Sequence, residues 1–176
     1  MTLARLKIVS VMVFMGVSFS LYASNNSGDK SHGISYPTGW KNWSSIAVSH
    51  RVDNHTLRLI LGNQIAVKAA RSGNTNPWPK GSVLAKVVWK ESKKSSWYSA
   101  IVPDEFIHAE FMFKDASKYS DTYGWGWARW VGGKQIPFNA GSNICSDCHS
   151  PVKEKDWVFT VPAVFPKNYA VVPSLV

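Results

Sequence analysis

The sequence predicts an α+β fold that consists mainly of antiparallel β-sheet, with two or three helices. Several segments alternate polar and apolar residues with a period of two, which is typical of strands with one buried face. One segment has a helical pattern between an asparagine and a glycine, and segments rich in glycine and proline separate the elements. The chain has 176 residues, nine of them tryptophan, which suits one domain with a sizeable core.

The first predicted elements are a turn, a helix, a strand and a second helix. Tyr36–Trp40 contains a proline and a glycine and predicts a turn, and Lys41–Val48 after it is predicted to be a short helix. The alternation in Thr56–Leu61 predicts a strand. Asn63 can cap a helix that ends at the first residue of Gly73–Gly81, which is predicted to be a loop.

Four further strands are predicted, at Ser82–Trp89, Glu105–Phe113, Tyr123–Val131 and Asp156–Val161. In the first of them, Lys86 is the one charged residue in an apolar run. In the second, the alternation places four side chains on one face: Phe106, His108, Glu110 and Met112. A lysine or glutamate on a buried face is costly unless it is paired or chemically used, so Lys86 and Glu110 are candidate site residues.

Residues 1–23 have the layout of a secretory signal peptide. Arg5 and Lys7 precede the uncharged apolar run Ile8–Leu21, and Ala23 is a small residue suited to cleavage. The run is shorter than the about 20 residues of a spanning helix. We therefore expect a periplasmic protein without a stable membrane anchor after cleavage, with an uncleaved anchor as the alternative. Residues 24–35 are predicted to be flexible, 36–165 to form the domain and 166–176 to be a tail.

The two cysteines of the chain lie in the motif Cys145-Ser-Asp-Cys148-His149. A disulfide, a thioredoxin-like redox pair and a zinc site are possible uses of such a pair. The adjacent histidine favours a fourth use, the attachment signature of c-type haem. In that arrangement, the two thiols add to the haem vinyl groups and His149 binds the iron. The motif therefore predicts one covalently bound haem c, with Cys145, Cys148 and His149 as its attachment and ligand residues.

The second axial position of the iron has no obvious ligand in the sequence. Met112 is the only methionine outside residues 1–23, and no methionine follows the motif. A second histidine could serve instead, and four are candidates: His32, His50, His55 and His108. An open distal face is favoured, which is typical of gas binding or small-molecule chemistry rather than of simple electron carriage.

The formal net charge is +9, but the basic residues are scattered along the chain. This pattern does not predict nucleic-acid binding. It indicates a solvated basic surface, with attraction to an acidic electron-transfer partner as a second interpretation.

Several motifs occur in an order that resembles a known family. They are Tyr36-Pro37-Thr38-Gly39-Trp40, Pro79-Lys80-Gly81-Ser82-Val83, Lys114-Asp115, Gly124-Trp125-Gly126-Trp127, the haem motif and Asp156-Trp157-Val158-Phe159. This set resembles the cytochrome P-460 family, together with its relative cytochrome c′-beta, over nearly all of the chain after residue 35. The resemblance implies a largely antiparallel sheet packed with helices around the haem, and a homodimer.

The resemblance also implies an activity and two further site residues. Cytochrome P-460 proteins oxidise hydroxylamine, and can use nitric oxide, toward nitrous oxide, and an electron-accepting cytochrome would collect the electrons. Lys86 matches the lysine that forms a third covalent bond to the haem. Glu110 matches a distal carboxylate, which could have a raised pKa and relay protons. Without these roles, Lys86 and Glu110 would form a cross-strand ion pair on an exposed sheet face.

Two alternatives to this enzyme remain open from the sequence. A cytochrome c′-beta-like protein would bind nitric oxide or carbon monoxide without turnover, in a pocket capped by Phe106, Phe111 or Phe113. A plain electron carrier is the other alternative, which the missing methionine ligand disfavours.

Overall fold

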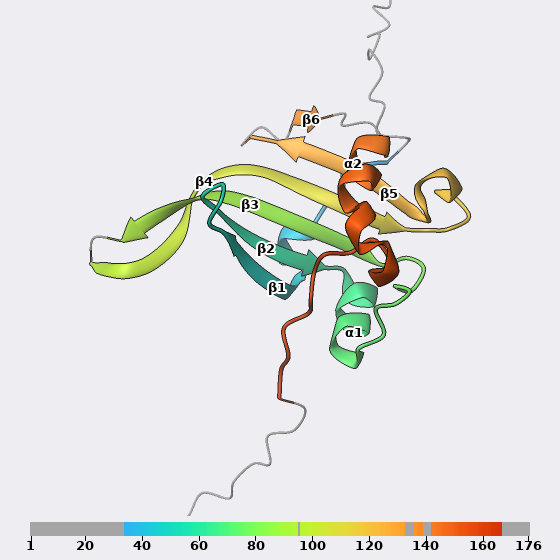
Figure 1. The fold of residues 1–176 in the computed structure, drawn as a ribbon, viewed down its shortest axis with the longest axis horizontal. Helices are drawn as coiled ribbons and strands as arrows, with labels where there is room; N and C mark the ends of the chain where they lie inside the picture. Colours follow the sequence, from blue (N-terminus) through green and yellow to red (C-terminus); the bar gives the residue numbers. More distant parts are fainter. Residues whose placement is uncertain (1–33, 95, 133–135, 139–141, 167–176) are drawn as a thin grey trace, which may run out of the picture.

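The computed structural model describes residues 34–94, 96–132, 136–138 and 142–166. Within this part, six strands form one antiparallel sheet in which each strand pairs with the next in sequence (Figure 1). The strands are β1 (Ser44–Arg51), β2 (Thr56–Gly62), β3 (Val83–Lys94), β4 (Trp97–Lys114), β5 (Trp125–Val131) and β6 (Ile136–Phe138). The predicted α+β class, with a mainly antiparallel sheet, is confirmed.

Two α-helices accompany the sheet, α1 (Gln64–Ser72) and α2 (Ser142–His149). Both lie on the same side of it (Figure 1). Three short 3-10 helices are η1 (Trp40–Asn42), η2 (Ser120–Thr122) and η3 (Ser150–Lys155). None of the described helices is long and apolar enough to cross a membrane. The predicted signal peptide, residues 1–23, lies outside the described residues.

Helix α1 begins and ends as its sequence predicts. The side-chain oxygen of Asn63 accepts a hydrogen bond from the amide of Ala66 at 3.0 Å, which caps the first turn. Gly73 ends the helix with a φ of 76°, a left-handed conformation that glycine adopts without strain. The same Asn63 oxygen accepts from the amide of Val83 at 3.1 Å, so the cap also fastens the helix to β3.

Two predicted elements are wrong. Lys41–Val48 is not a helix, because only the turn of η1 forms there and β1 begins at Ser44. The β-branched Ile46 suits a strand, and pairing with β2 satisfies the backbone of β1. Asp156–Val161 is not a strand, because Asp156 and Trp157 have φ values of 51° and 65°, which turn the chain away from an extended path.

The strands β3 and β4 are longer than predicted. They extend beyond Trp89 and before Glu105 into a hairpin arm that projects from the rest of the sheet (Figure 1). The arm is polar or exposed on both faces, so its sequence lacks the alternation that identifies a strand. Cross-strand backbone hydrogen bonds hold it extended instead.

Each face of the sheet carries its own hydrophobic core. The helix-side core contains Ile46, Ile60, Ala66, Val67, Ala69, Trp78, Leu84, Trp125, Trp127 and Val158. The opposite core contains Ile34, Trp40, Leu61, Ala85, Val87, Ala109, Phe111 and Trp130. The N-terminal segment of the described chain covers the opposite core, and Ile34 already belongs to it, two residues before the predicted start of the domain.

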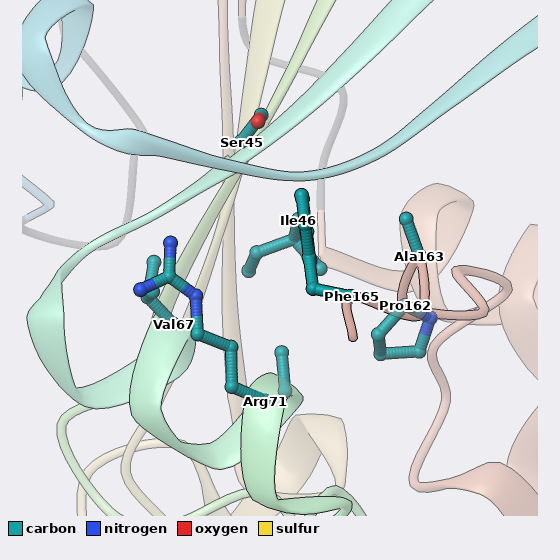
Figure 2. Close-up of a pocket in the computed structure, with 8 residues that line it drawn as sticks. Ser45, Ile46, Val67, Arg71, Pro162, Ala163 and Phe165 are labelled. Carbon is teal, nitrogen blue, oxygen red and sulfur yellow. The ribbon is translucent and has the colours of Figure 1, made fainter. Parts of the chain in front are cut away.

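The chain after η3 runs along β1 and α1. Ala163 donates its amide to the carbonyl of Ile46 at 2.9 Å. Figure 2 shows the small hollow that this segment closes, which is lined by Ile46 of β1, Arg71 of α1 and Phe165 among others. The hollow is lined mainly by apolar side chains and adds to the packing of the helix-side core.

Replacing Phe111 with alanine is expected to destabilise the fold by about 3–5 kcal/mol. The ring is 1% exposed and contacts four other aromatic rings edge-on in the opposite core, so the truncation leaves a cavity. Equilibrium unfolding in urea measures the change. The matched control is Val48→Ala at a 75% exposed strand position, which should shift stability by less than about 0.5 kcal/mol. A loss below about 1 kcal/mol for Phe111→Ala would contradict this packing.

Candidate functional site

A row of charged side chains crosses three neighbouring strands on the helix side of the sheet. Lys86 of β3 lies directly opposite Glu110 of β4, and Glu110 lies directly opposite Arg129 of β5. Directly opposed residues in an antiparallel pair present their side chains on the same face. Glu110 forms ion pairs with both Lys86 and Arg129, and His108 Nε2 lies 3.3 Å from Glu110 Oε1.

The carboxylate of Glu110 is therefore buried but well partnered, with its side chain 18% exposed. Burial by itself would raise the pKa of Glu110. The hydrogen bond from His108 and the charges of Lys86 and Arg129 outweigh this effect and hold the pKa well below its usual range. The expected raised pKa is thus corrected, because the sequence did not show how many donors surround this residue. The expected ion pair does form, on a partly buried face rather than an exposed one.

Glu110 is expected to make the stability of the fold sensitive to acid. Its pKa is depressed in the folded chain from the ordinary value of 4.5, so its stabilising contribution is complete above pH 4.5 and is lost as the pH falls below it. Urea unfolding at pH 7 and at pH 3 measures this loss. Glu110→Gln should lose less stability than the parent between these two pH values. Equal losses in both proteins would contradict the assigned environment.

The haem motif lies on α2, which places its two thiols on one side of a helix. Cys145 and Cys148 are three residues apart, a spacing that brings side chains close on a helical surface. Both are free thiols, and Cys145 packs against the helix-side core while Cys148 is exposed. Burial raises the pKa of the Cys145 thiol.

His149 ends α2 with one ring nitrogen held by the backbone. Its Nδ1 donates a hydrogen bond to the carbonyl of Trp157 at 2.7 Å, and a carbonyl can only accept. Nε2 consequently carries the free lone pair, which is the form that binds a metal. Burial lowers the pKa of His149, which favours this neutral form. The rings of Trp127 and Phe159 lie edge-on to the imidazole, with centroids at 4.6 and 4.9 Å.

The charged row and the haem motif lie close together on the same side of the sheet. Trp127, which contacts His149, is two residues from Arg129 on β5 and therefore points to the same face. The charges of Lys86 and Glu110 also act on the pKa of His149 and of Cys145. The fold thus brings together all five residues that the sequence singled out: Lys86, Glu110, Cys145, Cys148 and His149.

Two buried donors near this region fit a bound group that carries acceptors. Within the described residues, Trp127 Nε1 and Arg58 Nε are buried and have no hydrogen-bond partner. An unsatisfied buried donor costs about 1–3 kcal/mol, which an acceptor would relieve. Arg58 is two residues along β2 from Ile60, the partner of Lys86, and therefore lies on the same face. A haem offers carboxylates as acceptors and a planar apolar body, and the thiols and imidazole of α2 are its usual attachment groups.

Residues 37–160 match the family described as Cytochrome P460. The chain belongs to the cytochrome P460 family. It is therefore a cytochrome, with haem and its iron as cofactor. The matched range includes the charged row, the haem motif and Trp157. A search of the curated proteins found no match.

The structure of this cytochrome P460 chain corrects the expected aromatic cap. Phe111 and Phe113 lie in or against the opposite core, on the other face of the sheet from Glu110. Phe106 also packs there, because the register of β3 and β4 shifts at a bulge between Val88 and Trp89. Phe106 therefore pairs with Trp89 and lies beside its ring against the opposite core. The simple alternation that grouped Phe106 with Glu110 is therefore wrong. None of the three rings can cap a pocket on the helix side.

Sequence reasoning missed some functional contacts of this cytochrome P460 chain and misjudged others. Arg129 was not singled out, although its alternation with Trp127 on β5 already places both on one face. Of the candidate second ligands, His108 reaches the site, whereas His50 and His55 both contact Glu91 away from it. His32 lies outside the described residues. The Trp157 carbonyl has no sequence signal, because any residue carries one.

Proposed function

We propose that this chain is an exported c-type cytochrome with one covalently bound haem, which oxidises hydroxylamine toward nitrous oxide and can also use nitric oxide as a second nitrogen substrate in that reaction. The observation that carries the proposal is the placement of Lys86 and Glu110 on the same side of the sheet as Cys145 and His149, in a cytochrome P460 chain. The resemblance assigns one role to each of these residues, and their chemistry suits those roles.

The chain's own residues would hold the cofactor from two directions. Cys145 and Cys148 would form thioether bonds, and His149 would bind the iron through Nε2. Lys86 would form the third covalent bond, to the macrocycle. That C–N bond would replace one N–H and one C–H bond, and an external two-electron oxidant would take up the electrons. When bound, the haem supplies the iron centre that takes up electrons from the substrate.

Glu110 would move the protons of the reaction. Oxidation of hydroxylamine to nitrous oxide releases one proton with each electron, and an ionised carboxylate can accept it. A covalent bond at Lys86 Nζ would remove the ammonium charge that faces Glu110. The pKa of Glu110 would then rise from its depressed value toward the range that suits a proton acceptor. Formation of the lysine bond and tuning of the base are coupled in this proposal.

The proposal includes a cellular location, an electron acceptor and an oligomeric state for the enzyme. Arg5, Lys7 and the apolar run Ile8–Leu21 support export to the periplasm. The net charge of +9, which becomes +7 when Arg5 and Lys7 are removed with residues 1–23, supports an acidic electron-accepting cytochrome as partner. The family resemblance supports a homodimer.

A second candidate function is binding of nitric oxide or carbon monoxide without turnover. The ion pair between Lys86 and Glu110 favours it, because an ammonium group held by a carboxylate is not a nucleophile and would leave the macrocycle unmodified. This candidate would keep the same haem attachment and the same ligand, His149.

The ferrous optical spectrum of the protein, produced with a haem-attachment system, is expected to show a broad and strongly red-shifted Soret band. That band reports modification of the macrocycle through Lys86. Lys86→Arg keeps the charge but should not form the bond, so it should give an ordinary c-haem spectrum. An ordinary spectrum for the parent protein would reject the lysine bond and favour gas binding.

A further inference from the structure

Asp156 contacts three other segments of the chain. It directly precedes Trp157, whose carbonyl accepts the hydrogen bond from His149. One carboxylate oxygen lies 2.6 Å from Lys114 Nζ at the end of β4, and the other accepts the amide of Trp78 at 2.8 Å. The main-chain carbonyl of Asp156 accepts the indole nitrogen of Trp125 at 2.9 Å. The next carbonyl along the chain, that of Trp157, is the acceptor for His149 Nδ1.

The pair between Lys114 and Asp156 is buried, with each side chain only 10% exposed. The ammonium group of Lys114 also lies 4.8 Å from the ring centroid of Trp125. Removing two charges from water costs several kcal/mol per ion, so a buried pair is weak evidence for stability. Its contacts instead fix one arrangement of the chain around Asp156.

The backbone of Asp156 and Trp157 has an unfavourable conformation that surrounding contacts must stabilise. Asp156 and Trp157 both have positive φ values, which cost of order 1–3 kcal/mol each for residues other than glycine. The surrounding contacts maintain this conformation. Trp157 donates its amide to the carbonyl of Val152 at 3.1 Å, and its ring stacks on Tyr123 with the centroids 3.9 Å apart. The chain turned in this way presents the Trp157 carbonyl to His149.

We propose that Lys114 and Asp156 are positioning residues for the proximal ligand, which set the hydrogen bond between Trp157 and His149. The inference rests on the proposed role of His149 as the iron ligand. A strong hydrogen bond at Nδ1 raises the basicity of Nε2 and fixes the orientation of the ring. Greater donation from Nε2 stabilises ferric over ferrous iron, so the Lys114–Asp156 pair lowers the reduction potential of the haem.

The test uses the intact haem protein and two variants that break the pair from opposite sides, Asp156→Asn and Lys114→Gln. Lys114→Gln leaves the hydrogen bond from the amide of Trp78 to Asp156 in place. This variant therefore still tests the proposal if Asp156→Asn does not fold. The matched control is Lys80→Gln, which breaks an ion pair with Asp115 at a 70% exposed lysine near the same end of β4. Lys114→Arg retains the charge and should restore the parent behaviour.

Resonance Raman spectra of the ferrous proteins give the iron–histidine stretching frequency, and redox titration gives the midpoint potential. We expect the stretching frequency to fall and the potential to rise in both pair-breaking variants, with no change in Lys80→Gln. A histidine band and potential unmoved from the parent would overturn the positioning role while leaving ligation by His149 intact. If the parent shows no iron–histidine band, or shows one that persists in His149→Ala, the proposed ligand is wrong. This inference then fails with it.

Discussion

Replacing Glu110 with alanine is expected to lower hydroxylamine turnover by about 100-fold or more, because a positioned proton acceptor contributes about 100- to 10,000-fold to a rate. Glu110 lies between Lys86 and Arg129 in the charged row and is ionised at neutral pH, and the lysine bond would raise its pKa toward the range of a proton acceptor. Steady-state oxidation of hydroxylamine with an external electron acceptor measures the effect. Haem content should stay the same, since Glu110 attaches no part of the cofactor.

The matched control for this prediction is Glu105→Ala on the same strand. Glu105 is an exposed glutamate whose ion pair with Lys90 lies outside the site, so its removal should leave turnover within about twofold of the parent. Glu110→Gln separates charge from shape, because it keeps the side-chain volume but cannot accept the proton. Turnover by Glu110→Ala within about threefold of the parent would refute the proton-acceptor role.

The double variant Cys145→Ser, Cys148→Ser is expected to lose both thioether bonds to the haem. The chain contains no other cysteine that could replace them. Mass spectrometry of the denatured protein measures covalent attachment directly. The parent should carry the mass of one haem, and each single variant should retain a less stable attachment through the remaining thiol.

The control for the motif is Ser150→Ala, at the exposed residue directly after His149. Its hydroxyl donates to the carbonyl of Asp147 at 2.8 Å, so full haem attachment should persist without it. A covalently attached haem in the double cysteine variant would contradict the assumption that the thioether bonds are needed for attachment. It would locate the bond at Lys86 alone and show that thioether formation is not required for it.

Features that depend on neighbouring residues could be predicted from the sequence. Helix α1 has its cap, Asn63, and its terminating Gly73 within one short segment, and both act as expected. The alternation in Ser82–Trp89 correctly separated Lys86 from the residues of the opposite core, because side chains of a strand alternate between two faces. The haem motif is likewise local, since three adjacent functional groups suffice to identify it.

Errors arose where distant contacts override local preference. Ile46 entered a strand rather than the predicted helix because β2 was available as a partner. The bulge that moves Phe106 to the opposite core is a property of the β3–β4 pairing and not of either strand. At Asp156, a buried lysine and a tryptophan amide hold a backbone conformation that the apolar pattern after it did not indicate.

The sequence by itself determined the attachment motif, the α+β class and the two unusual charged residues, Lys86 and Glu110. Only the tertiary structure decided that they face each other, that Arg129 and His108 join them, and that the pKa of Glu110 is lowered rather than raised. The physical reason is that electrostatic environment depends on distance in space. Sheet register brings together charges that lie 19 and 24 residues apart along the chain, and burial strengthens their effect on one another.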